Sequence, residues 1–148
     1  MPHADNRKAL YDYEILEKYQ AGLALTGQEA KSIKAGHMSL KGSHVTFHNG
    51  EAFLFNANIS KYPQAGKLPD YDPTHSRKLL LKKKEIRYLQ GKLQEKGLTI
   101  IPLSVYTKNR FVKIEIAVAR GKKQYDKRET IKQRDTQREA RQAMKFSN

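Results

Sequence analysis

The segment around residue 50 alternates apolar and polar residues in the way that is typical of a β-hairpin. Val45 and Phe47 precede Asn49-Gly50, and Phe53 and Phe55 follow it. Asn-Gly between two alternating segments favours a type I′ turn, because both central residues of that turn need positive φ. The pattern therefore predicts two antiparallel strands joined at Asn49-Gly50.

A longer stretch, residues 99–119, repeats this pattern. Its apolar residues alternate before and after a turn predicted at Lys108-Asn109, while Lys113 and Glu115 occupy polar positions between them. Period-2 alternation over this length predicts a half-buried strand pair. We expect a second hairpin with one face on the core and one face in solvent.

A further strand is predicted near the N-terminus. Tyr13 and Ile15, and then Leu23 and Leu25, occupy alternate positions. Gly22 lies between the two pairs, and an isolated glycine in a strand often marks a bulge or bend. We expect the strand to be interrupted there.

Two helices are predicted by their end signals and by their period. Thr26 and Glu29 have the spacing of a capping box, and Gly36 follows the short segment that they begin. The second helix covers 82–96, where apolar residues recur at i, i+3 and i+7 and basic residues fill the other face. Between the helices, three prolines mark 61–76 as a loop.

These elements place the chain in the mainly β class with short helices. We predict an OB-like closed antiparallel barrel of about six strands with two or three flanking helices. The barrel would span residues 1–119. Residues 120–148 would form a basic C-terminal tail.

The net charge of +14, from 29 Lys and Arg against 15 Asp and Glu, is concentrated in two segments. Residues 1–76 are balanced, whereas 77–96 carry eight basic and two acidic side chains and 120–148 carry ten and four. Such an excess indicates a nucleic acid or another anionic partner. Because the tail has almost no apolar side chains beyond Ile131 and Met144, we expect it to be disordered when free and to order on a polyanion.

The first basic segment predicts a ridge that neutralises phosphates. Its cations lie on both sides of Leu79-Leu80-Leu81, which we expect to be a buried anchor: Arg77, Lys78, Lys82, Lys83, Lys84 and Arg87. The alternative is an ordinary solvated helix face. In the tail, Tyr125 has only charged and polar neighbours, so its ring is a candidate for stacking on a base.

The remaining chemistry gives little indication of catalysis. The absence of cysteine excludes disulfides and thiolate metal sites and fits a cytoplasmic protein. No apolar run reaches the roughly 20 residues that span a bilayer, so we expect no membrane partner. Asp70, Asp72 and His75 could hold magnesium in a nuclease, but turn chemistry also explains these aspartates. We expect no enzyme activity, no cofactor and no bound metal.

Several blocks of sequence closely resemble the SsrA-binding protein family, also called small protein B, the partner of transfer-messenger RNA (tmRNA). The blocks occur in order along almost the whole chain: NRKA at 6–9, AGLALTGQEAKS at 21–32, RKLLL at 77–81, IPLSVY at 101–106 and ARGKKQYDKR at 119–128. Where that family usually has Glu, this chain has Gln20, and Lys82 replaces the common His or Asn.

The resemblance implies a protein of trans-translation, the rescue of stalled ribosomes. Such a protein binds the tRNA-like domain of tmRNA (SsrA RNA), acts with elongation factor Tu, and brings the RNA to the A site of a stalled 70S ribosome. Its tail would become helical in the empty decoding centre and mRNA channel, beside small-subunit rRNA. We expect a monomer.

Site residues follow from the same resemblance, position by position. The residues that the resemblance places at the tRNA-like domain are Asn6, Gln20, Gly22, Arg77, Leu80 and Lys82, and the full set expected there also includes Arg7, Lys78 and Lys83. The set expected at the decoding centre and mRNA channel is Gly121, Lys122, Lys123, Tyr125, Asp126, Lys127 and Arg128. Two other functions stay open at this point: a ribosomal protein with a basic tail, and the metal-dependent nuclease.

Overall fold

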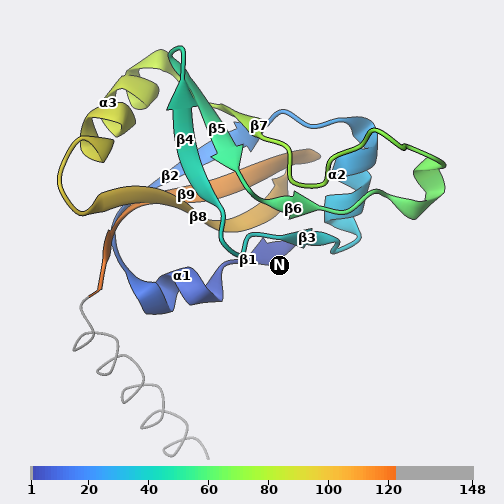
Figure 1. Cartoon of the computed structure of the whole chain (residues 1–148), viewed down its shortest axis with the longest axis horizontal. Coiled ribbons are helices and arrows are strands. Elements are labelled where there is room, and N and C mark those ends of the chain that lie inside the picture. Colours follow the sequence, from blue (N-terminus) through green and yellow to red (C-terminus); the bar gives the residue numbers. More distant parts are fainter. Residues whose placement is uncertain (1, 123–148) are drawn as a thin grey trace, which may run out of the picture.

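The computed structural model describes residues 2–122 and consists mainly of a seven-stranded antiparallel sheet (Figure 1). In chain order its elements are β1 (Ala4–Asp5), α1 (Arg7–Asp12), β2 (Tyr13–Leu23), α2 (Gly27–Lys34), β3 (Met38–Ser39), β4 (His44–His48), β5 (Glu51–Phe55), β6 (Asn58–Ile59), the 3-10 helix η1 (Pro63–Ala65), β7 (Arg77–Leu80), α3 (Lys83–Leu93), β8 (Leu98–Lys108) and β9 (Phe111–Gly121). The mainly β class predicted from the sequence is confirmed.

The large sheet is strongly curled, but its hydrogen bonds do not close it into the predicted barrel. Its strand order is β1-β8-β9-β2-β7-β5-β4, and β3 and β6 form a separate two-stranded sheet. Strand β4 lies alongside β8 without pairing to it in the part of the chain described. Val45 of β4 and Ile100 of β8 belong to one buried cluster. Side-chain packing therefore joins β4 to β8, where the predicted barrel would have backbone hydrogen bonds.

Both predicted hairpins are present, the second with its turn displaced by one residue. Asn49 and Gly50 have φ of 51° and 74°, as a type I′ turn requires. In the second hairpin Asn109 and Arg110 take the positive φ values, 51° and 71°, and Lys108 stays paired with Phe111. Asparagine tolerates the left-handed region better than lysine, so it occupies the first turn position.

The predicted interruption at Gly22 is wrong. Strand β2 is continuous from Tyr13 to Leu23, and its register shift lies earlier, between Ile15 and Glu17. Gly22 pairs with Lys113 of β9 on one side and with Leu80 of β7 on the other. It therefore marks the point where β2 changes partners, and its missing side chain has a packing cause, described below.

The two located helices are confirmed, and the possible third is α1, whose position was not predicted. In α2, the Thr26 hydroxyl accepts from the Glu29 N–H and the Glu29 carboxylate accepts from the Thr26 N–H, which completes the capping box. Helix α3 buries Ile86 and Leu89. Helix α1 is short and buries only Ala9, so it carries no apolar period that sequence reasoning could detect.

Alternate residues of β9 serve two packing surfaces. Ile114 and Ile116 belong to the main core, whereas Ala117 and Ala119 pack with Ala9 of α1 in a second, smaller cluster. The small alanines let α1 lie close against that face of the sheet. Strand β9 continues to Gly121, so the first two residues of the expected tail, 120 and 121, belong to the sheet.

Candidate nucleic-acid interface

A row of four residues crosses the outer face of the sheet at the C-terminal end of β2. Leu80, Gly22, Lys113 and Tyr106 are direct partners in neighbouring strands β7, β2, β9 and β8. Directly opposed residues of an antiparallel ladder project to the same face. The row therefore brings an aliphatic, a cationic and an aromatic side chain together around a glycine.

Gln20 extends this row. It is two residues before Gly22 on the same strand, so its side chain shares the outer face. Its Nε2 donates a hydrogen bond to the Tyr106 hydroxyl, which orients both side chains. The amide oxygen of Gln20 and the Tyr106 ring remain at the surface as groups that can meet a base edge or a base face.

The lack of a side chain at Gly22 makes room for Leu80. A Cβ built at Gly22 would lie 3.2 Å from Leu80 Cδ1 and 3.3 Å from Leu80 Cβ. The Leu80 side chain nevertheless remains 54% exposed. The expectation that all three leucines of 79–81 form a buried anchor is wrong for Leu80, because the strand alternation buries Leu79 and turns Leu80 outward.

Three of the predicted residues line one hollow of about 280 Å³ between β7 and α3. They are Lys78, Leu80 and Lys83. Lys78 Nζ lies 3.3 Å from Glu51 Oε1, and both side chains are about half exposed, at 47% and 49%. An exposed pair of this kind stabilises the fold by less than about 1 kcal/mol. Lys78 can therefore leave Glu51 for a phosphate at little cost.

Lys82 begins the cationic face of α3. It is the N-cap residue, and its backbone N–H donates to Glu85 Oε1 at 3.0 Å. Lys82, Lys83, Lys84 and Arg87 all have exposed side chains. This part of the predicted basic ridge is at the surface.

Arg77 is the exception, and its predicted place on that ridge is wrong. The residue is only 1% exposed, and its side chain donates inward. Its Nε and Nη2 bond to Glu29 Oε2 at 3.0 and 2.8 Å, while Nη1 donates to the Ala57 carbonyl at 2.7 Å. Arg77 alternates with exposed Lys78, so the strand period sends it to the core.

The Glu29–Arg77 pair is the centre of a polar cluster that ties the 61–76 loop to α2. The Tyr71 hydroxyl lies 3.1 Å from Glu29 Oε2 and donates to the Ile59 carbonyl at 2.7 Å, while His75 Nε2 lies 3.0 Å from the same carboxylate. Burial opposes ionisation of Glu29, but the hydrogen bond from Thr26 and the Arg77 guanidinium outweigh it and lower the pKa of the carboxyl. Burial, followed by the Glu29 charge, raises the pKa of Tyr71.

Asp72, one of the two aspartates of the nuclease hypothesis, is engaged in turn geometry. Asp72 Oδ1 accepts from the Thr74 N–H at 2.9 Å and from the Thr74 hydroxyl at 3.0 Å, and the backbone hydrogen bond lowers the pKa of Asp72. His75 faces Glu29. Among residues 2–122, no three His, Asp or Glu side chains converge as a metal site would need.

Asn6 and Arg7 lie apart from the Leu80 row. Asn6 is 9% exposed at the start of α1, where its Nδ2 donates to the Pro102 carbonyl at 2.8 Å. Arg7 is exposed on α1. Gly121 ends β9 opposite Tyr13, and Lys122 follows it. The other five residues expected at the decoding centre, at 123 and 125–128, lie outside the described residues.

Sequence reasoning missed three members of the outer face. The alternation of the sequence already indicates that Tyr106 and Lys113 point outward. Their register with Gly22, however, is visible only in the folded sheet. Phe111, at the tip of the β8–β9 hairpin, is 68% exposed. It follows Arg110, which is also exposed, so an aromatic residue and a cationic residue are adjacent at this turn. Within the described part of the chain, no helix has the length and apolar character to cross a membrane.

This surface combines cations, an exposed leucine and aromatic rings on a curled antiparallel sheet. Fold and surface together define the class as a small β-sheet protein with a nucleic-acid-binding type of face. A family model described as SmpB protein matches residues 3–146. The chain belongs to the SmpB, or SsrA-binding protein, family.

Individual relatives agree with this assignment. The SsrA-binding protein of Ligilactobacillus salivarius is 54% identical over 142 residues, which cover 96% of this chain and 91% of the relative. That of Sulfurihydrogenibium is also 54% identical, with 96% and 93% covered. A chain from a solved structure described as "tmRNA-SmpB: a journey to the center of the bacterial ribosome" is 47% identical, with a TM-score of 0.68 over 81% of this chain and 84% of that one.

Proposed function

We propose that this protein binds the tRNA-like domain of tmRNA and carries it to stalled ribosomes in trans-translation. Membership of the SmpB family supports this proposal, as does the likeness to a chain from a tmRNA–SmpB ribosome structure. The observation that carries it is the outer row around Gly22, where the Leu80 side chain lies against the glycine and is still 54% exposed.

The outer row supplies the shape-specific part of the interface. Leu80 offers an apolar contact to an unstacked base, and Gln20 and Tyr106 offer hydrogen-bonding and stacking groups beside it. Folded RNA is recognised mainly through such unpaired loop bases, because the bases of a helix are inaccessible from its deep major groove. The elbow of a tRNA-like fold is made of such loops.

The lysines supply the part of the affinity that depends on charge. Lys78, Lys82 and Lys83 lie around the same leucine and would each neutralise a phosphate, with Arg7 a further cation on α1. Arg77 acts indirectly in this proposal. Its ion pair with Glu29 fixes the start of β7 and so sets the positions of Lys78 and Leu80.

The C-terminal segment from Gly121 onward is proposed for the second partner, the ribosome. Gly121, Lys122, Lys123, Tyr125, Asp126, Lys127 and Arg128 would lie in the empty decoding centre and mRNA channel. We also propose that the protein binds elongation factor Tu in the delivery complex. It would act in the cytoplasm as a monomer and catalyse no reaction.

A competition gel shift tests the first step. The full chain is titrated against the isolated tRNA-like domain of tmRNA at physiological salt, with an elongator tRNA as competitor. We expect at least tenfold preference for the tRNA-like domain, because contacts of the outer row add to the phosphate contacts that any RNA provides. Equal, salt-sensitive binding to both RNAs would contradict the proposal and leave a ribosomal protein as the better hypothesis.

A further inference from the structure

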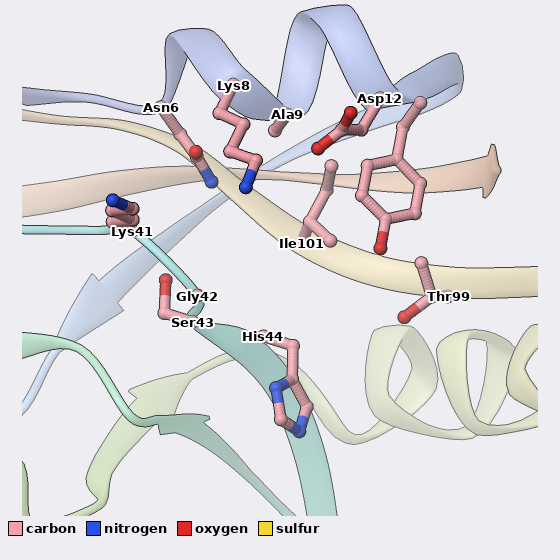
Figure 2. A pocket seen from close by; sticks show the side chains of 11 residues that line it. Asn6, Lys8, Ala9, Asp12, Lys41, Gly42, Ser43, His44, Thr99 and Ile101 are labelled. Carbon is pink, nitrogen blue, oxygen red and sulfur yellow. The ribbon is translucent and has the colours of Figure 1, made fainter. Parts of the chain in front are cut away.

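A second polar hollow of about 380 Å³ lies between α1, the loop before β4 and the start of β8. Figure 2 shows Asn6 and Lys8 reaching from α1 over this space, with Lys41 on the side of Asn6 and Thr99 on the side of Asp12. Its walls come from three separate parts of the chain.

The chemistry of the hollow differs from one end to the other. Lys8 and Lys41 have exposed side chains and supply two cations near Asn6. Asp12 lies at the other end and disfavours an anion there. An anionic ligand group therefore belongs between the two lysines.

The remaining lining fits a flat, hydrogen-bonding group. Asn6 is fixed by its 2.8 Å bond to the Pro102 carbonyl, which orients its amide at the hollow. Tyr13 and His44 add rings to the wall, and Thr99 adds a hydroxyl. Rings, an oriented amide and flanking cations are the groups with which proteins bind an unpaired nucleotide.

The hollow lies beside the root of the C-terminal segment and far from the Leu80 row. The Lys122 N–H donates to the Asp12 carbonyl at 2.9 Å, and Lys122 Nζ donates to the Leu10 carbonyl at 3.3 Å. Tyr13 and Gly22 occupy opposite ends of β2, roughly 30 Å apart along an extended strand. One RNA loop at the Leu80 row does not also fill the hollow.

We infer that this hollow binds one unpaired nucleotide of the RNA that surrounds the C-terminal segment. The inference rests on the proposed function, under which that RNA is ribosomal rather than tmRNA, and it moves Asn6 from the set expected at the tRNA-like domain to the ribosomal side. The phosphate lies between Lys8 and Lys41, and the base lies toward Tyr13 and Thr99. The nucleotide then anchors α1 next to the segment that enters the decoding centre.

The test begins with the isotope-labelled full chain titrated with single-stranded hexa-adenylate at physiological salt. We expect saturable amide shifts concentrated at Lys8, Lys41 and His44, with affinity at least tenfold weaker in the double variant Lys8→Glu, Lys41→Glu. Both lysines are exposed, so this variant should keep the wild-type spectrum elsewhere. The matched control is Lys31→Glu, Lys34→Glu on α2, which should change the affinity less than twofold.

A rescue assay on stalled ribosomes separates this inference from the proposed function. The double variant should lose at least tenfold in tagging while its affinity for the tRNA-like domain stays within twofold of wild type. Unchanged tagging, absent hollow shifts, or equal shifts with hexaglutamate would overturn the nucleotide site. If the double variant lost binding to the tRNA-like domain, the assignment of the hollow to ribosomal RNA would be overturned. Failure of the wild-type chain to bind that domain would instead overturn the proposed function.

Discussion

Neighbouring residues on β7 have different roles: some are buried and stabilise the fold, and others are exposed to a partner. Arg77 and Leu79 are 1% exposed, whereas Leu80 is 54% exposed. Residue type alone predicts the reverse, a buried leucine and a solvated arginine. The burial of Arg77 could not be read from the sequence because its partner, Glu29, lies 48 residues away and meets it only in the folded chain.

Replacement of Leu80 should therefore affect RNA binding much more than stability. We expect Leu80→Ala to change the free energy of unfolding by less than about 1 kcal/mol, because most of the side chain is already in water. Affinity for the tRNA-like domain should fall at least about tenfold, the effect of losing about 1.4 kcal/mol of interface contact.

The control for this prediction is Leu16→Ala. Leu16 is 40% exposed on β2 but lies at its register shift, away from the Leu80 row. Urea unfolding and gel-shift titration of both variants give the comparison. Equal RNA affinity for the two variants would remove Leu80 from the interface.

At the scale of elements, the sequence predicted the two hairpins, α2 and α3, because each is specified by local signals. The capping box at Thr26 and the Asn49-Gly50 turn are examples. Strand register and the partner change at Gly22 depend on contacts between distant segments and could not be predicted. For the same reason the hollow beside α1 could not be predicted, because its lining residues are far apart in the sequence.

The buried pair Glu29–Arg77 joins α2 to β7, and its loss should be costly. We expect Glu29→Gln to lower the free energy of unfolding by about 3–5 kcal/mol, because it leaves the Arg77 guanidinium buried without its counter-charge. Urea denaturation at neutral pH measures this. Glu51→Gln, which breaks an exposed pair, is the matched control and should cost less than about 1 kcal/mol.

The same pair predicts a pH dependence. The folded pKa of Glu29 lies below its ordinary value of 4.5, so the unfolded chain binds the proton more tightly. Its contribution to stability is complete above pH 4.5 and is lost as the pH falls through the lower, folded pKa. Below pH 4.5 the wild-type free energy of unfolding should therefore fall more steeply than that of Glu29→Gln. If the free energies of unfolding of the two chains fell equally steeply below pH 4.5, this explanation of the cluster would be contradicted.

At the scale of the whole molecule, we propose that the chain has two functional parts. Residues 2–122 contain the sheet, its core clusters, the outer row and the basic segment 77–96, and residues 123–148 add eight basic and four acidic side chains. In the proposed function, one surface of the sheet binds tmRNA and the C-terminal segment binds the ribosome.

The most direct measurement of that claim compares the full chain with a chain ending at Lys122. Both are assayed for binding to the tRNA-like domain and for tagging on stalled ribosomes. We predict that the shortened chain binds the RNA within about threefold of the full chain, because the outer row is intact, and that it supports no tagging. Loss of RNA affinity on truncation, or full tagging without residues 123–148, would contradict the account.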